Sequence, residues 1–306
     1  MSLPTLMELL ALRASARGLS LRAQGAARAL LLGAHRSVRH GRGLEIEEVR
    51  PYVVGDDLRS IDWRVTARRG RLHTKLYREE RERPVWLLVD LSASMFFGSR
   101  GQLKSALAVR AAALLAWAAA LGEDRGGAGI GNGERTRVLA LRSREAGVLP
   151  ILNALIDLQP RQPGLQPRQP GRDVAEPGAE TLRSLIPLVR PGSVVIALSD
   201  FHSPGLQSQE QWSTLAAHSD CRWLWITDPL EERALPKGRF LAGFGGKVAP
   251  VDGASVRSAW LATWAQRAAR ITELTSALRI GLLRLDTAQN VADALHATLG
   301  SAKSAA

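Results

Sequence analysis

The chain has only one cysteine, Cys221, among its 306 residues. A single cysteine excludes an intrachain disulfide, which fits a protein of the reducing cytoplasm. Cys221 stands in the segment 221–226, which is apolar except for Arg222 and predicts a buried strand, and buried thiols are usually inert. The sequence therefore predicts a cytoplasmic protein without a catalytic cysteine.

Long hydrophobic runs are lacking as well. No uncharged apolar stretch reaches the roughly 18 residues that suggest a membrane helix, and the most apolar predicted helix, 103–121, contains Lys104 and Arg110. Glu8 lies ahead of the first arginines, and no cleavage site follows an apolar core, so no secretory signal is predicted. These absences predict a chain without a membrane span.

Common catalytic motifs are missing too. The sequence contains no P-loop and no Gly-x-Ser-x-Gly turn. The histidines show no metal-ligand spacing and form no evident dyad with a nucleophile: His35, His40, His73, His202, His218 and His296. We therefore expect a protein that is not an enzyme.

Acidic residues are scarcer than basic ones, with 29 Asp and Glu against 41 Lys and Arg and a net charge of +12. Seven arginines between residues 13 and 42 have no acid among them: Arg13, Arg17, Arg22, Arg28, Arg36, Arg39 and Arg42. Phosphate binding needs such a surface, but the region lacks interleaved aromatics and any DNA-reading motif. We interpret residues 1–40 as an amphipathic helical arm that docks on an acidic surface, and the alternative is nucleic-acid binding through this basic arm.

Two further regions follow the arm. Residues 41–83 contain two stretches of alternating apolar and charged residues, which predict a small β element. Within it, the turn Gly55-Asp56-Asp57 leads to Trp63, which we interpret as a packing anchor. From residue 84 to 300, strand patterns alternate with helical ones, which predicts an α/β fold with a doubly wound, mostly parallel sheet.

The predicted strands of this larger region are 85–90, part of 127–131, 136–141, 193–199, 222–227 and 281–285. The predicted helices are 103–121, 149–158, 182–189, 209–218, 255–278 and 290–299. The second and third strands follow each other so closely that we expect a hairpin with an antiparallel edge strand.

A proline-rich repeat interrupts the α/β region. Residues 159–165 and 166–172 agree at six of seven positions, and the frequent prolines forbid both a helix and a strand ladder. We predict a disordered loop over 159–178 and a flexible tail over 301–306.

The strongest chemical signal lies where the first strand of the α/β region ends. A run of five apolar residues, 85–89, leads directly into Asp90-x-Ser92-x-Ser94, and a later strand ends at Asp200. Ligands of open α/β folds bind at the carboxyl ends of such strands, and these oxygen donors suit a hard cation such as Mg²⁺. The alternative interpretation is a capped turn, because Asp and Ser are also preferred where a strand gives way to a helix.

These residues resemble the metal-ion-dependent adhesion site of von Willebrand factor type A domains. More specifically, residues 45–64, with Gly55-Asp56-Asp57 and Asp62-Trp63, and the later segment Asp228-Pro229-Leu230-Glu231 are similar to domain-of-unknown-function family 58. The resemblance implies a Rossmann-type sheet and a Mg²⁺ or Mn²⁺ site.

The same resemblance implies which residues bind the ion. Asp90, Ser92 and Ser94 would bind it, and Asp200 would act through water. A threonine from a second loop would complete the set. Thr181 is the threonine available there, but Arg172 stands where the family's Gly-Thr-Asp-Leu pattern has threonine, so the second-loop ligand stays open.

Members of this family resemble partners of MoxR-type AAA+ ATPases. The resemblance therefore implies a non-enzymatic adaptor that binds such an ATPase through the metal and an acidic residue of the partner. The rival interpretation is a metal-assisted hydrolase that uses Asp90 and Asp200, although the sequence offers no convincing base for it.

Overall fold

The computed structural model divides the chain into two compact units, which are considered separately. The larger unit comprises Met1–Leu31 and Arg83–Ala306, and the smaller one comprises Leu32–Glu82. The residues that the structure describes are 2–21, 44–53, 56, 58–79, 82–160, 178–244 and 247–299. Residues 301–306, most of the predicted loop 159–178, including Arg172, and residues 22–40 of the predicted arm lie outside them.

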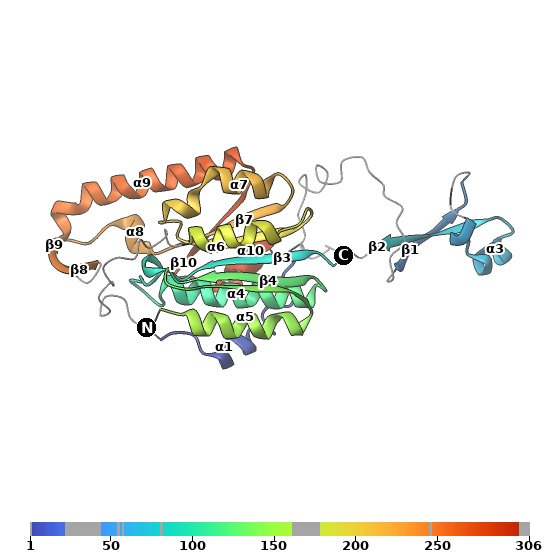
Figure 1. Cartoon of the computed structure of the whole chain (residues 1–306), viewed down its shortest axis with the longest axis horizontal. Helices are drawn as coiled ribbons and strands as arrows, with labels where there is room; N and C mark the ends of the chain where they lie inside the picture. The colour runs from blue at the N-terminus through green and yellow to red at the C-terminus, as the bar shows by residue number, and fades with distance from the viewer. Residues whose placement is uncertain are drawn as a thin grey trace. The chain divides into compact units, whose positions relative to one another are not determined.

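A six-stranded mixed sheet forms the centre of the larger unit (Figure 1). In spatial order its strands are β10 (Gly281–Asp286), β7 (Asp220–Thr227), β6 (Val194–Ser199), β3 (Pro84–Asp90), β4 (Arg125–Gly131) and β5 (Thr136–Ser143). Every pairing is parallel except the β4–β5 hairpin, which is antiparallel. The predicted parallel sheet with an antiparallel edge strand is confirmed.

Helices cover both faces of the sheet, as Figure 1 shows. One face carries α1 (Leu6–Ala11), α4 (Lys104–Leu121), α5 (Glu145–Leu158) and α10 (Val291–Leu299), and the other carries α6 (Ala179–Leu185), α7 (Gln209–Ala216) and α9 (Gly253–Ala277). Short 3₁₀ turns lie at η2 (Ala93–Met95), η3 (Ile186–Leu188) and η4 (Pro204–Gln207).

Strand β3 explains why two helical layers are needed. Val85, Leu87 and Val89 belong to one hydrophobic core, while Trp86 and Leu88 belong to the core on the opposite face. Successive side chains of a strand point to opposite faces, so a strand that is apolar at every position must be covered on both. The doubly wound α/β fold is therefore confirmed.

Helix α4 lies inside the first of these cores. By length and composition it is the one described helix that could cross a membrane, yet 83% of its apolar window is buried inside the fold. It contacts β3 and α5 directly. Its apolar surface is thus accounted for by packing within the larger unit.

Two elements after β7 are absent from the sequence-based prediction. Asp228 caps the short helix α8 (Pro229–Arg233), and a two-stranded antiparallel ribbon follows, formed by β8 (Arg239–Phe244) and β9 (Lys247–Asp252). The ribbon leads into α9, whose first turn is capped by Asp252. The missed α8 matters most, because it carries a charged residue of the candidate site.

The N-terminal segment differs from the predicted helical arm where the structure describes it. Helix α1 ends at Ala11, and the following turns bury Ala16 and Leu21 in the same core as Leu9. The indole N–H of Trp117 donates to the carbonyl of Leu9 at 3.0 Å. Residues 2–21 thus pack against the α/β fold, because Leu9, Ala16 and Leu21 are buried in its core.

The arginine run is only partly described. Arg13 pairs with Glu145 and lies over the ring of Trp117. The members of the run outside the described residues are Arg22, Arg28, Arg36, Arg39 and Arg42. Arg13 is therefore engaged within the fold rather than free for an acidic partner.

The smaller unit contains the predicted β element, β1 (Leu44–Pro51) paired with β2 (His73–Glu79), together with η1 (Leu58–Ser60) and the unpredicted α3 (Trp63–Arg69). Asp62 caps α3 by accepting the N–H groups of Arg64 and Val65. The interpretation of Trp63 as a packing anchor is wrong, because its side chain is 68% exposed at the first position of the helix.

Candidate metal site at the sheet edge

Two acidic residues meet at the carboxyl edge of the sheet. Asp90 is the last residue of β3, and Asp200 follows the last residue of β6. The two strands are parallel neighbours in which Val89 pairs with Leu198, so both chains leave the sheet at the same edge. The sequence-based expectation that the two acids lie together is thus met by the strand register.

The carboxylate of Asp90 is 1% exposed and accepts two hydrogen bonds. Its Oδ1 accepts the backbone N–H of Ser92 at 2.9 Å, and its Oδ2 accepts the hydroxyl of Ser199 at 2.7 Å. No Lys, Arg or His of the described residues forms an ion pair with it. Asp90 is therefore a buried acid whose charge has no cationic partner in the described part of the chain.

Ser92 and Ser94 connect Asp90 with Asp200. Ser92 is buried and its Oγ lies 3.4 Å from the Oγ of Ser94. Ser94 is half-buried and donates to Oδ1 of Asp200 at 3.2 Å. Four of the five predicted residues, Asp90, Ser92, Ser94 and Asp200, thus form one hydrogen-bonded group that is partly exposed at Ser94.

The turn after β6 is held in an unusual backbone conformation. Phe201 has a φ of 51°, which is uncommon for a bulky residue. Its ring stacks on Trp223 at 4.0 Å between centroids, and its N–H donates to the hydroxyl of Ser199. This packing fixes the turn that carries Asp200, and the same Ser199 hydroxyl orients Asp90.

The two acids differ in the direction of their pKa shifts. Burial, and then the charge of Asp200, raises the pKa of Asp90 to about 6, against the hydrogen bonds from Ser199 and Ser92. Burial also acts to raise the pKa of Asp200, but the ammonium of Lys104 and the N–H of His202 bring that pKa below its ordinary value. The difference follows from the cation that only Asp200 contacts.

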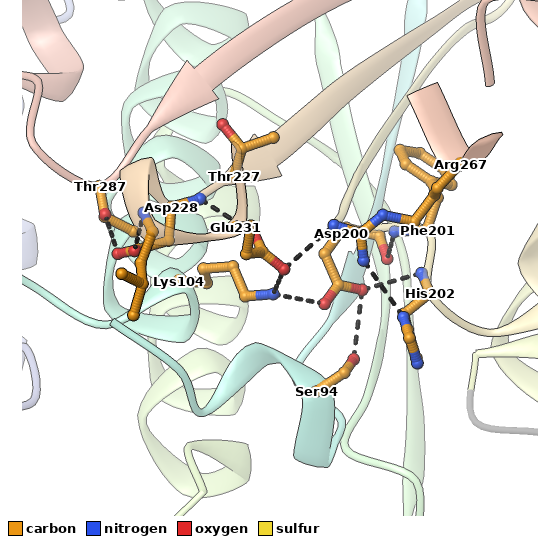
Figure 2. Close-up of polar contacts among 12 residues, drawn as sticks. Ser94, Lys104, Asp200, Phe201, His202, Thr227, Asp228, Glu231, Arg267 and Thr287 are labelled. Carbon is orange, nitrogen blue, oxygen red and sulfur yellow. Dashed lines mark hydrogen bonds and ion pairs between the residues drawn. The ribbon is translucent and has the colours of Figure 1, made fainter. Parts of the chain in front are cut away.

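Lys104, which the sequence analysis did not select, lies at the centre of a chain of charges (Figure 2). Its ammonium is 2% exposed and contacts Oδ2 of Asp200 at 2.7 Å and Oε1 of Glu231 at 3.1 Å. Arg267 donates to the same Glu231 oxygen at 3.0 Å and lies 3.1 Å from Nδ1 of His202. The acids keep the pKa of Lys104 above its ordinary value, although burial acts to lower it.

A signal for Lys104 was present in the sequence. Helix α4 is apolar on nearly all sides, which predicts a helix buried all round. A lysine in such a helix is seldom fully buried unless it is paired with an acid. Its partners lie 96 and 127 residues further along the chain, so only the fold identifies them.

Thr181, the proposed second-loop ligand, lies one strand away from Asp90. It is buried on α6, and its hydroxyl is 3.2 Å from the hydroxyl of Thr136. A Cβ on Gly131 would stand 2.1 Å from that hydroxyl, and Gly131 pairs with Asp90 in the sheet register. Thr181 therefore lies at the same edge, but its hydrogen bond goes to Thr136 and not to the Asp90 group.

A second buried carboxylate lies further along the same edge. Asp228 follows β7 and accepts the N–H and the hydroxyl of Ser99 at 2.8 and 2.5 Å. It also accepts the hydroxyl of Thr287 at 2.6 Å and the N–H of Leu230 at 2.9 Å. These donors lower the pKa of Asp228 although burial acts to raise it.

The residues at the edge fit a hard divalent cation. Asp90 brings a negative charge that no described cation offsets, and Ser92 and Ser94 bring hydroxyl oxygens beside it. Mg²⁺ and Mn²⁺ prefer such oxygen donors. Among the described residues no group of three or more His, Cys, Asp or Glu is placed to hold a metal, so hydroxyls have to supply part of any ligand set.

The single cysteine lies away from this chemistry. Cys221 is buried in β7, and burial together with Asp220 raises the pKa of its thiol to about 12. A thiol with so high a pKa stays protonated and unreactive. The prediction of an inert cysteine in a buried strand agrees with this environment.

Comparison with known proteins identifies relatives. Residues 48–268 match the model of the family described as "Protein of unknown function DUF58". Over 135 residues the chain is 41% identical to the uncharacterized protein Rv1480 of Mycobacterium tuberculosis and to the uncharacterized protein Mb1516 of Mycobacterium bovis. The alignments cover 44% of this chain and 43% of each relative, so the matched part spans less than half of those proteins.

Proposed function

The chain belongs to the family of proteins of unknown function DUF58, and from that premise we propose that it is a non-enzymatic, metal-dependent protein–protein interaction module. The observation that carries the proposal is the state of Asp90. It is a fully buried carboxylate with a pKa raised to about 6, and two serine hydroxyls lie next to it. A buried charge without a partner is costly, and a bound divalent cation would offset it.

Asp90, Ser92 and Ser94 would hold Mg²⁺ or Mn²⁺, with Asp200 beside them and Thr181 as the candidate ligand from the second loop. A cation bound there supplies positive charge and a coordination position for a carboxylate of another protein. The half-buried Ser94 is the member of the group through which a partner would approach. Ser199 and the backbone of Ser92 orient Asp90 for this role.

We propose a MoxR-type AAA+ ATPase as the partner. The support for this partner is the resemblance of the family to ATPase adaptors, and the support for an acidic contact residue is the chemistry of the site. Metal-bridged binding depends on the cation and on the partner's charge together.

Surface-immobilised full-length chain and a purified MoxR-type ATPase from the same organism provide the test. We expect binding in Mg²⁺, and at least about tenfold weaker binding after addition of a chelator or in Asp90→Asn, because the metal contact is lost. Asp220→Asn is the control, since Asp220 pairs with Arg222 at the opposite end of β7. Binding that is the same with chelator, or in Asp90→Asn, would exclude the metal-dependent module.

A further inference from the structure

The candidate metal site lies next to a buried cation of the chain itself, the ammonium of Lys104. The two carboxylate oxygens of Asp200 have different partners (Figure 2). Its Oδ1 accepts the hydroxyl of Ser94 and the N–H of His202, while its Oδ2 contacts the ammonium of Lys104. Lys104 and Asp200 are both almost fully buried. One carboxylate therefore separates the buried ammonium from the hydroxyls that would hold a divalent cation.

Lys104 belongs to an alternating series of charges from four elements. Asp200 follows β6, Lys104 begins α4, Glu231 lies on α8 and Arg267 lies on α9. The successive N···O distances are 2.7, 3.1 and 3.0 Å. The capping box of α8 holds Glu231 in place, because its Oε2 accepts the N–H of Asp228 at 3.0 Å.

The charges of this series cancel, but that of Asp90 does not. Lys104 and Arg267 bring two positive charges, and Asp200 and Glu231 bring two negative ones. Asp90 remains as one negative charge, and its Oδ1 and Oδ2 contact only neutral donors. Of Asp90 and Asp200, a divalent cation at the candidate site thus meets one uncompensated carboxylate, not two.

We propose that Lys104 is a resident counter-ion that sets the affinity of the site for a divalent cation by neutralising Asp200. The proposal rests on the metal-dependent function above and adds to it. With Lys104 in place, the bound cation keeps a net positive charge and attracts an acidic group from a partner. Without it, Asp90 and Asp200 together balance a divalent cation, so the metal binds more tightly.

An ion pair that serves only to hold α4 against α8 makes a different prediction. Lys104→Met and Glu231→Gln both remove the ion pair between these two residues, whose charged atoms lie 3.1 Å apart. Loss of a purely structural contact would change metal affinity in the same direction in both variants. A counter-ion changes it in opposite directions, because one variant removes a positive charge near the site and the other a negative one.

The test is a calorimetric titration of the full-length chain with Mn²⁺ alone. We expect Lys104→Met to bind Mn²⁺ about tenfold more tightly than the wild type. We expect Glu231→Gln to bind Mn²⁺ about threefold more weakly than the wild type. Glu232→Gln is the control, since Glu232 is the next residue along α8 but pairs with Arg284 at 2.6 Å on the surface. Its affinity should equal that of the wild type.

Lys104→Arg separates charge from packing, because it keeps the positive charge and should not tighten Mn²⁺ binding. If Lys104→Met fails to fold, the comparison of Glu231→Gln with Glu232→Gln decides the question. An Mn²⁺ affinity of Glu231→Gln equal to that of the wild type overturns the proposal. The proposal is also overturned if Lys104→Met and Glu231→Gln change the affinity for Mn²⁺ in the same direction. A wild-type chain that binds no Mn²⁺ contradicts the proposed function itself, whereas binding that Lys104→Met leaves unchanged contradicts only the counter-ion role.

Discussion

Asp90 and Asp228 are both buried carboxylates at the carboxyl ends of parallel strands in one sheet, but the hydrogen-bond donors around them differ. Asp228 accepts four hydrogen bonds, from Ser99, Thr287 and Leu230. Asp90 accepts hydrogen bonds only from Ser92 and Ser199, and neither carboxylate forms an ion pair with a described residue. The pKa of Asp228 is lowered, whereas burial and Asp200 raise that of Asp90 to about 6.

The difference separates a structural acid from a candidate binding acid. Asp228 joins the loop after β3, the start of α8 and the turn after β10, because Ser99, Leu230 and Thr287 come from these three segments. Its charge is stabilised by the fold alone. Position at the sheet edge is therefore not enough to predict a metal site, and the deciding property is a charge that the fold leaves uncompensated.

The largest expected effect comes from Asp228→Asn. An amide has one acceptor oxygen where the carboxylate has two, so some of the donors from Ser99, Leu230 and the buried Thr287 lose their acceptor. We expect the free energy of unfolding to fall by about 3 kcal/mol, measured by urea denaturation of the metal-free protein at pH 7. A loss below about 0.5 kcal/mol would remove the distinction between the two acids.

Asp90→Asn should change the free energy of unfolding in the opposite direction. The amide can still accept the N–H of Ser92 and can donate to the hydroxyl of Ser199, but it removes the buried charge. In metal-free protein at pH 7 we expect Asp90→Asn to raise the free energy of unfolding by about 2 kcal/mol. Urea denaturation measures this change under the same conditions as for Asp228→Asn.

The pH dependence of stability tests the cause. The pKa of Asp90 is about 6 in the folded chain against an ordinary 3.8, so the folded state binds the proton more tightly than the unfolded state. The resulting stabilisation is complete below the ordinary pKa and is lost as the pH rises through about 6, a change of about 3 kcal/mol. Asp90→Asn should therefore gain its advantage over the wild type between these two values, and a difference that is constant with pH would contradict this cause.

Much of the fold was predictable because its signals are local. The apolar run 85–89 predicted a strand covered on both faces, and β3 confirms it. The short spacing between β4 and β5 likewise predicted their antiparallel pairing. Helix α8 and the β8–β9 ribbon were missed, because α8 spans only Pro229–Arg233 and the ribbon stands outside the main sheet.

The candidate site was predictable where it follows a strand and not where it depends on distant packing. Asp90, Ser92 and Ser94 lie within one turn, and Asp200 joins them because β3 and β6 are neighbours. Lys104 and its partners come from separate helices, so their contacts are set by tertiary packing alone. The motif therefore identified the carboxylates and hydroxyls but not the cation that balances one of them.

The packing of the N-terminal segment was missed for a related reason. The leucines and alanines of residues 3–39 have helical spacing, which predicts an amphipathic arm of one or two helices. Leu9, Ala16 and Leu21 instead enter the core of the larger unit, and α1 ends at Ala11. Burial against α4 and α5 outweighs the weak local preference for a longer helix.

Titration of Mn²⁺ into Asp90→Asn and Asp228→Asn, each compared with the wild type, tests the central claim most directly. Both substitutions remove one buried carboxylate from the same sheet edge, and circular dichroism shows whether each variant is folded at the temperature of the titration. The account predicts that Asp90→Asn loses Mn²⁺ binding while Asp228→Asn keeps the affinity of the wild type within about twofold. Equal binding in the wild type and Asp90→Asn, or loss of binding in folded Asp228→Asn, would contradict the assignment of Asp90 as the metal-binding acid.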